Sequence, residues 1–297
     1  MARKLVRFVF ILLTISYFVL LVINGVASDT GGRRKLRVVT TFYPMYIMAV
    51  NVCKDVPDLE LTNLTSADAG CLHDYALTTT DMGKLESADI IIANGAGMES
   101  FLVRISRRYP RLKIVELAQG LPLIKNSAGP NPHVWVSVSR AIDEVRNLIQ
   151  FMARIDADHA LLYKKNGENY IGRLKALRSD MHAALAAYRG TPIVTFHEAF
   201  PYFAEEFGLK ITAVIDREPG SAPSAKELAG TIRTIRKYRV KALFTEPQYP
   251  AAPAVAISRE TGVRLSRLDP AVTGPDVPDA YIDIMRENLS VLQKALR

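Results

Sequence analysis

Three histidines lie in separate stretches of the chain, each just after a segment that resembles a strand or a turn. His73 lies in Gly-Cys-Leu-His-Asp-Tyr, His133 in Asn-Pro-His-Val-Trp, and His197 in Val-Thr-Phe-His-Glu-Ala-Phe. Asp269, in Arg-Leu-Asp-Pro, ends a fourth such strand. Imidazole nitrogens and carboxylate oxygens are zinc ligands, and three His with one Asp would complete a tetrahedral site. The sequence therefore predicts a metal site made of these four residues.

Two other acidic residues lie near the predicted site. Glu246, in Phe-Thr-Glu-Pro-Gln-Tyr, also ends a strand. It could orient a histidine by accepting the second ring N–H, or replace Asp269 as the fourth ligand. Glu198 adjoins His197, but Pro201 stands where the second histidine of an H-E-x-x-H motif would fall. The zinc-protease motif is therefore absent.

The chain contains two cysteines, Cys53 and Cys71. In an exported protein an even number of cysteines suggests a disulfide, and a Cys53–Cys71 bridge would stiffen the His73 loop. Two unpaired thiols are the first alternative. The second is that Cys71, two residues before His73, is itself a metal ligand, and the sequence leaves the three interpretations open.

Strand-like apolar runs alternate with helical patterns in the first half of the chain. The expected strands are 36–42, 59–64, 89–94 and 113–117. The expected helices are about 44–53, 79–87 and 98–108. Continuous apolar runs such as Asp-Ile-Ile-Ile-Ala-Asn are typical of a parallel sheet covered on both faces.

The second half repeats this alternation. Its expected strands are 192–196, 210–215, 241–245 and 264–268. Its expected helices are 199–207, 225–238, 252–261 and 279–296. The pattern predicts an α/β fold with two parallel-sheet lobes of about four strands each.

A long helical region separates the two halves. One helix is expected over 138–155, and a second begins near Asp156 or Asp158 and runs to about residue 188. Gly167 and Gly172 each weaken this second helix by about 1 kcal/mol relative to Ala. A helix of about thirty residues would be roughly 45 Å long and would hold the lobes at a fixed distance. The expected boundaries are 36–155 for the N-terminal lobe, 156–189 for the linking helix and 190–297 for the C-terminal lobe.

The four candidate ligands share one kind of position. Ligands of open parallel sheets bind outside the carboxyl ends of the strands. His197 and Asp269 follow strands directly, and His73 and His133 lie in loops a few residues after strands. We therefore expect the metal in the cleft between the lobes, with two ligands from each lobe. The remaining histidines, His159 and His182, fall on the long helix and are expected at the surface.

Residues 1–28 differ from the rest of the chain. A short basic stretch precedes an apolar run over 8–23, and small residues follow at 25–28. This is the pattern of a secretory signal peptide. An uncleaved signal anchor is the alternative, because the run is near the length that spans a bilayer. No cysteine lies near residue 28, so lipid attachment at a cleavage site is excluded. The folded part is expected outside the cytoplasm: secreted, at the cell surface or anchored to the membrane, and periplasmic if the cell has an outer membrane.

Composition excludes disorder and gives no sign of nucleic-acid binding. The 297 residues are 49% hydrophobic and 23% charged, which is ordinary for a globular chain with room for two domains. The net charge of +8 comes from Lys and Arg scattered along the expected helices. A nucleic-acid partner would require a binding motif or interleaved aromatic residues, and neither is found. We expect a monomer.

Seven short segments together carry a more specific pattern. They are Val-Val-Thr-Thr-Phe-Tyr-Pro-Met-Tyr at 38–46, His-Asp-Tyr-Ala-Leu-Thr at 73–78, Ala-Asp-Ile-Ile-Ile-Ala-Asn-Gly-Ala-Gly-Met-Glu at 88–99, Asn-Pro-His-Val-Trp at 131–135, Thr-Phe-His-Glu-Ala-Phe at 195–200, Thr-Glu-Pro-Gln-Tyr at 245–249 and Leu-Asp-Pro at 268–270. Through them the chain resembles the zinc/manganese-type substrate-binding proteins of bacterial ABC transporters, over nearly its whole mature length. The resemblance implies two α/β lobes joined by one rigid helix, a metal buried between them with ligands His73, His133, His197 and Asp269, and delivery of the ion to a membrane permease.

The chain departs from the family pattern at three places. Leu72 follows Cys71 where the family commonly has Pro before the first histidine. Asn131 stands where the family commonly has Asp. Residues 119–130 contain no histidine, so the His-rich loop of some zinc-specific members is absent. None of these changes removes a predicted ligand.

The leading hypothesis is a high-affinity extracytoplasmic receptor for Zn²⁺, with Mn²⁺ as the alternative ion. A third histidine at 197 favours zinc, because manganese-preferring relatives are expected to have a carboxylate there. Four protein ligands would leave no position for a reactive water, so we expect no enzymatic activity. A zinc-dependent hydrolase, or a surface adhesion protein with a structural metal, remain the alternatives.

Overall fold

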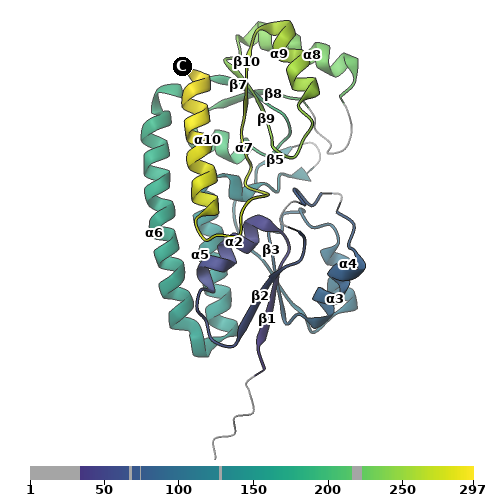
Figure 1. The fold of residues 1–297 in the computed structure, drawn as a ribbon, viewed down its shortest axis with the longest axis vertical. Helices are drawn as coiled ribbons and strands as arrows, with labels where there is room; N and C mark the ends of the chain where they lie inside the picture. The colour runs from purple at the N-terminus through teal and green to yellow at the C-terminus, as the bar shows by residue number, and fades with distance from the viewer. Residues whose placement is uncertain (1–33, 67–68, 74, 127–128, 216–222) are drawn as a thin grey trace, which may run out of the picture. The chain divides into compact units, whose positions relative to one another are not determined.

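Two parallel four-stranded sheets provide the framework, described here from a computed structural model (Figure 1). The structure describes residues 34–66, 69–73, 75–126, 129–215 and 223–297. The N-terminal sheet has the order β2 (Leu59–Asn63), β1 (Leu36–Thr40), β3 (Ile90–Ala93), β4 (Lys113–Glu116). The C-terminal sheet has the order β10 (Arg264–Arg267), β9 (Ala242–Thr245), β7 (Pro192–Thr195), β8 (Lys210–Val214). The predicted α/β fold with two parallel sheets is confirmed.

The strands end slightly earlier than the sequence predicts. For example, β1 stops at Thr40 rather than at residue 42, and β7 stops at Thr195 rather than at residue 196. The apolar residues that follow, Phe42 and Phe196, are buried in the turns beyond the strands. Apolar character therefore continues past the sheet, because these turns pack into the core as they carry the chain toward the site.

Helices α2 (Tyr43–Val52), α3 (Thr79–Ser87) and α4 (Leu102–Arg108) accompany the N-terminal sheet. A capping box between Thr78 and Asp81 fixes the start of α3. The sequence placed the start of α4 at residue 98, four residues too early. The Glu99 carboxylate instead accepts the backbone N–H groups of Asn94 and Gly95, at 2.8 and 3.0 Å, and so holds this stretch as a turn.

Two long helices follow the N-terminal sheet. Helix α5 (Val138–Ile155) is capped by the hydroxyl of Ser137. Helix α6 (Ala160–Leu185) has 26 residues and continues 3-10 turns at Ala157–His159 and Ala186–Tyr188, giving 32 residues in all. At about 1.5 Å per residue, α6 alone is roughly 39 Å long. Figure 1 shows α6 lying beside the last helix, α10 (Ala280–Leu296): α6 extends from the level of one sheet to that of the other, whereas α10 begins near α2.

Helices α7 (Pro201–Phe207), α8 (Ala225–Tyr238) and α9 (Ala252–Thr261) accompany the C-terminal sheet. The sequence did not predict the short antiparallel pair of β5 (Lys125–Asn126) and β6 (Gly129–Pro130), nor the 3-10 turn η1 (Val134–Val136). These elements lie between β4 and α5, and β6 and η1 flank His133 directly.

The apolar core runs through the whole of residues 36–297, which form one compact unit. Adjacent residues of β7 show how the C-terminal sheet is covered on both faces. Ile193 packs into the main core with α7 and α10, whereas Val194 packs into a second cluster with α8 and α9. Successive side chains of a strand point to opposite faces of the sheet, because the backbone is pleated.

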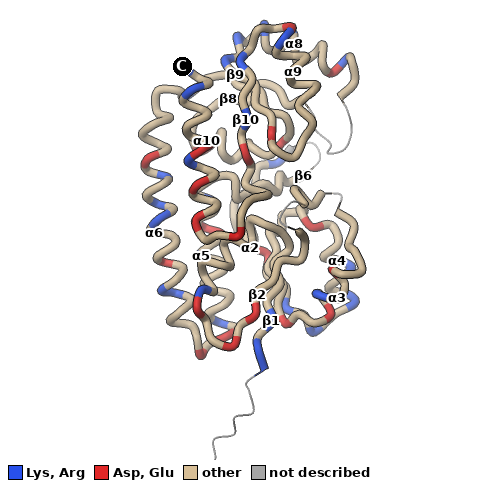
Figure 2. Tube along the Cα trace, in the orientation of Figure 1, with Lys and Arg blue, Asp and Glu red and all other residues tan. Residues whose placement is uncertain are grey.

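Charged residues are distributed along the helices rather than gathered at one place. In Figure 2, Lys and Arg alternate with Asp and Glu along α6 and α10. The signal-peptide prediction concerns residues 1–28, which lie outside the described residues. Within the described parts of the chain, no helix combines the length and the apolar character needed to cross a bilayer.

Candidate metal centre

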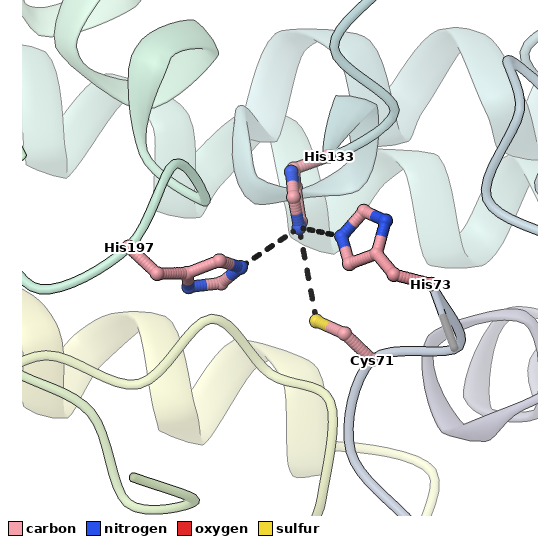
Figure 3. A group of neighbouring side chains, drawn as sticks. All are labelled: Cys71, His73, His133 and His197. Atoms are coloured by element: carbon pink, nitrogen blue, oxygen red, sulfur yellow. Dashed lines mark hydrogen bonds between the residues drawn. The ribbon is translucent and has the colours of Figure 1, made fainter. Parts of the chain in front are cut away.

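Four potential metal ligands converge beyond the carboxyl ends of the strands (Figure 3). They are Cys71, His73, His133 and His197, and their ligand atoms all lie within 4.8 Å of one another. Cys71 and His73 come from the loop after β2, and His133 comes from the turn before η1. His197 lies two residues after the end of β7. Both halves of the chain contribute to the cluster, three residues from the first half and one from the second, whereas the sequence led us to expect two from each.

His133 lies at the centre of the cluster. Its Nε2 atom is 3.2 Å from Nε2 of His73 and 3.1 Å from Nε2 of His197. The Sγ atom of Cys71 is 3.7 Å from the same nitrogen. Each histidine therefore directs its Nε2 atom toward a common point.

A hydrogen-bond network sets the orientation of the His133 ring. The Oδ1 atom of Asn131 accepts from the backbone N–H of His133 at 3.0 Å and lies 3.2 Å from its Nδ1. The Nδ2 atom of Asn131 donates to the carbonyl of Glu198 at 2.8 Å, so the amide oxygen must face the ring. The proton of the neutral imidazole is therefore on Nδ1, and the lone pair of Nε2 faces the cluster. Sequence reasoning noted Asn131 only as a departure from the family pattern.

Glu246 has the corresponding position next to His197. Its two carboxylate oxygens lie 2.9 and 2.8 Å from Nδ1 of His197, and one also accepts the backbone N–H of His197 at 3.2 Å. Both side chains are buried. Glu246 is therefore placed to orient His197, one of the two roles that the sequence allowed for it.

The two buried histidines differ strongly in their affinity for protons. Burial, together with the neighbouring His197 and His73, holds the pKa of His133 well below its usual range. Burial also disfavours a charged His197, but the negative charge of Glu246 and the hydrogen bonds with Cys71 and Glu246 outweigh it and raise the pKa of His197 to about 10. A metal ion that binds the cluster must therefore compete with a proton at Nε2 of His197, but not at Nε2 of His133.

Aromatic side chains enclose the cluster. The ring of Trp135 is fully buried, with its centroid 5.4 Å from that of His133, and its Nε1 donates to the carbonyl of Pro270 at 2.7 Å. The ring of Tyr249 is 5.1 Å from that of His197. These side chains limit the access of water to the histidines and strengthen electrostatic interactions at the site.

Asp269, the fourth ligand predicted from the sequence, is not one of the four residues of the cluster. Its Oδ1 atom accepts the backbone N–H of Ala271 at 2.8 Å, and its own backbone is bonded to the side chain of Asn288 at 2.8 and 2.7 Å. Burial raises the pKa of the Asp269 carboxyl, and the charge of Glu246 adds to the shift. Its carboxylate is not among the donors that lie within 4.8 Å of one another.

Of the three interpretations that the sequence left open for the cysteines, the disulfide is not formed, and both cysteines are free thiols. Cys53 follows α2 and is buried near Asp156 and Tyr163, where burial raises its pKa to about 12. Cys71 instead lies beside His133 in the cluster. The bridge fails because the two residues pack in different places, which their separation in sequence does not reveal.

The two remaining histidines lie on or beside the long helix and outside the cluster. The Nδ1 atom of His159 is 2.8 Å from a carboxylate oxygen of Asp156. The Nε2 atom of His182 is 3.4 Å from the carboxylate of Glu206, and its side chain is 42% exposed. Neither offers a ligand to the candidate site.

Comparison with known proteins gives a consistent family. Residues 38–295 match the family described as "Zinc-uptake complex component A periplasmic". The chain is 28% identical over 294 residues to the high-affinity zinc uptake system protein ZnuA of Bacillus subtilis, covering 92% of this chain and 91% of that protein. It is 27% identical over 297 residues to the zinc-binding protein AdcA of Streptococcus pyogenes, covering 90% of this chain but only 57% of that longer protein.

Solved structures agree with this match. The substrate-binding protein FpvC of Pseudomonas aeruginosa, in complex with Mn²⁺, has a TM-score of 0.80 and 29% identity, covering 88% of this chain and 98% of that chain. The laminin-binding protein Lmb of Streptococcus agalactiae has a TM-score of 0.79 and 25% identity, covering 88% of this chain and 100% of that chain. That protein is described as bifunctional, with adhesin and metal-transporting activity. Similar proteins are thus described with zinc and with manganese.

Proposed function

Because this chain belongs to the family of periplasmic zinc-uptake components, we propose that it captures Zn²⁺ outside the cytoplasm and passes it to a membrane permease. As a member of this family it is a divalent-metal-binding receptor of an ABC uptake system, a transport component and not an enzyme. The preference for zinc, the ligand residues and the permease partner are the parts that we propose. The proposed ligands are His73, His133 and His197, whichever residue supplies the fourth donor.

One observation carries the proposal: the Nε2 atoms of His73 and His197 both lie within hydrogen-bond distance of Nε2 of His133, with no carboxylate among the converging donors of the described residues. Nitrogen donors suit Zn²⁺, whereas sites rich in oxygen donors suit Mn²⁺. The hydrogen bonds that His133 and His197 donate to Asn131 and Glu246 support the assignment, because metal-binding imidazoles usually donate their second N–H to such groups.

Metal analysis and competition titration test this function. Protein purified from residue 29 onward should bind one equivalent of Zn²⁺ and prefer it to Mn²⁺. The His197→Ala variant should lose tight binding, whereas His182→Ala, which removes an exposed histidine of α6, should keep it. Unchanged zinc affinity in His197→Ala would falsify the ligand assignment.

Export is the second part of the proposal, and it rests on the signal-like pattern of residues 1–28 together with the periplasmic description of the family. Cell fractionation should place the protein outside the cytoplasm. Sequencing of the mature N-terminus distinguishes cleavage near residue 28 from a retained anchor. Recovery of the full-length chain in the cytoplasm would contradict export.

Surface adhesion is a second candidate function, favoured by the similarity to the bifunctional streptococcal protein Lmb. Binding of the purified chain to immobilised laminin tests it. Saturable binding that persists in His197→Ala would assign adhesion to a surface distinct from the metal site. Absence of binding would leave metal transport as the sole function.

A further inference from the structure

We propose that the thiolate of Cys71, rather than the carboxylate of Asp269, is the fourth protein ligand of the bound zinc. The site would then contain three imidazoles and one thiolate. This inference rests on the proposed function and deepens it, because it names the residue that sets the preference among metals.

The distances in the cluster fit such a site. In a tetrahedral zinc centre with normal bond lengths, two ligand nitrogens lie about 3.3 Å apart, and a nitrogen and a sulfur about 3.6 Å apart. The two nitrogen–nitrogen distances to His133 are 3.2 and 3.1 Å, and the distance from Cys71 Sγ to His133 Nε2 is 3.7 Å. Relative to His133 Nε2, the sulfur is therefore at the distance of a zinc ligand, and all four ligand atoms lie within 4.8 Å of one another.

The nearby carboxylates are held by other groups. Both oxygens of Glu246 face Nδ1 of His197, and one also accepts from Gln248 at 2.9 Å. Asp269 accepts the backbone N–H of Ala271 and lies outside the converging donors. Cys71, by contrast, is one of the four converging donors.

The loop that carries Cys71 is anchored. Leu72, between Cys71 and His73, is fully buried in the main core. Gly70, just before Cys71, has a φ of +74°, a backbone conformation that side chains rarely adopt. Figure 3 shows the Cys71 and His73 side chains leaving this loop toward His133. The described residues 70–73 thus present two potential ligands from one short segment, which matters because holding ligands in place favours binding.

A thiolate changes what the site can bind. Sulfur is a soft donor that favours zinc and disfavours manganese, which prefers carboxylate, carbonyl and water oxygens. Four protein donors also fill a tetrahedral zinc sphere and leave no position for a reactive water. Cys71 would therefore make this receptor more selective against Mn²⁺ than a site with Asp269 as the fourth ligand.

Cobalt substitution tests the assignment directly. Co²⁺ bound by a thiolate gives a sulfur-to-metal charge-transfer band in the near ultraviolet, which nitrogen and oxygen ligands do not give. The chain has two cysteines, so in Cys53→Ala the only thiol is Cys71. We expect the band in reduced wild type, in Cys53→Ala and in Asp269→Asn, and its absence in Cys71→Ser.

Zinc affinity gives a second readout. Loss of the thiolate should weaken zinc binding by at least the roughly 10–100-fold that loss of a ligand's supporting hydrogen bond costs. The ratio of zinc to manganese affinity should fall in Cys71→Ser and stay nearly unchanged in Asp269→Asn. Circular dichroism tests whether each variant is folded. If Cys71→Ser does not fold, the presence or absence of the charge-transfer band in Cys53→Ala still shows whether Cys71 binds the metal.

The outcomes separate this inference from the proposed function. Stoichiometric Co²⁺ binding without a charge-transfer band, or zinc affinity that depends on Asp269 and not on Cys71, would overturn the thiolate ligand while leaving a histidine-based receptor. Failure of the wild type to bind any divalent metal would overturn the proposed function itself.

Discussion

His133 and His197 lie 3.1 Å apart at their Nε2 atoms, yet their second nitrogens face groups of different charge. Nδ1 of His133 faces the neutral amide of Asn131, and Nδ1 of His197 faces the carboxylate of Glu246. Burial and the neighbouring histidines keep His133 neutral, while the carboxylate of Glu246 makes His197 a stronger base. Metal binding must therefore displace a proton from His197, and a second from Cys71 if its thiol becomes a ligand.

The first prediction concerns pH. The pKa of His197 is raised to about 10 in the metal-free protein, so its Nε2 carries a proton at neutral pH. Because the metal-bound ring cannot hold that proton, zinc affinity should fall as pH is lowered from about 9 to about 6, with roughly one proton released by His197 for each ion bound. Competition titration at several pH values measures the slope.

The Glu246→Gln variant is the matched control for this pH dependence. Without the carboxylate charge the pKa of His197 should return toward its ordinary value. Above about pH 7, the slope of the logarithm of zinc affinity against pH should therefore decrease by about one proton. The same change should weaken zinc binding in the range where His197 is neutral, because the ring loses its orienting partner. Equal slopes in wild type and variant would show that Glu246 does not control the proton on His197.

At the scale of elements, the close approach of α5 and α6 depends on one glycine. A Cβ atom at Gly167 would collide with Cδ1 and Cγ1 of Ile149, a buried residue of α5. A Cβ atom at Gly172, on the same helix, would meet nothing within 4 Å. The two glycines look equivalent in the sequence, but only Gly167 is required by packing.

The second prediction compares alanine at these two positions. Gly167→Ala should lower the free energy of unfolding by roughly 1–3 kcal/mol, because an added methyl group overpacks the interface. Gly172→Ala should raise it by up to about 1 kcal/mol, because alanine favours the helix. Denaturant unfolding with circular dichroism measures both, and adding Ile149→Val should recover part of the loss in Gly167→Ala. Similar stabilisation by both alanines would refute the close contact.

At the scale of the whole folded unit, the core does not depend on the metal site. One apolar cluster extends from the N-terminal sheet through α5 and α6 to α10 and one face of the C-terminal sheet. The candidate ligands lie in loops beyond the strand ends, so their charge state affects few of these contacts. Residues 36–297 should therefore stay folded without metal.

The third prediction concerns metal removal. A chelator should strip zinc while the far-ultraviolet circular dichroism remains native, in contrast to a protein with structural zinc, which would unfold. The melting temperature should fall on removal, because a ligand that binds only the folded state adds about 4 kcal/mol at a free concentration 1,000 times its dissociation constant. The His197→Ala variant should show little of this shift, and unfolding of the wild type by chelator would indicate a structural metal instead.

The sequence by itself determined the alternation of strands and helices, because apolar periodicity and caps act locally. Helices α3, α5, α8 and α9 have the predicted boundaries, 79–87, 138–155, 225–238 and 252–261. It also indicated His73, His133 and His197, since residues that follow parallel strands share one edge of a sheet. Only the tertiary structure decided that Cys71 lies among these histidines and that Cys53 does not pair with it. Those outcomes depend on how loops distant in the sequence pack against one core, and no spacing along the chain encodes that distance.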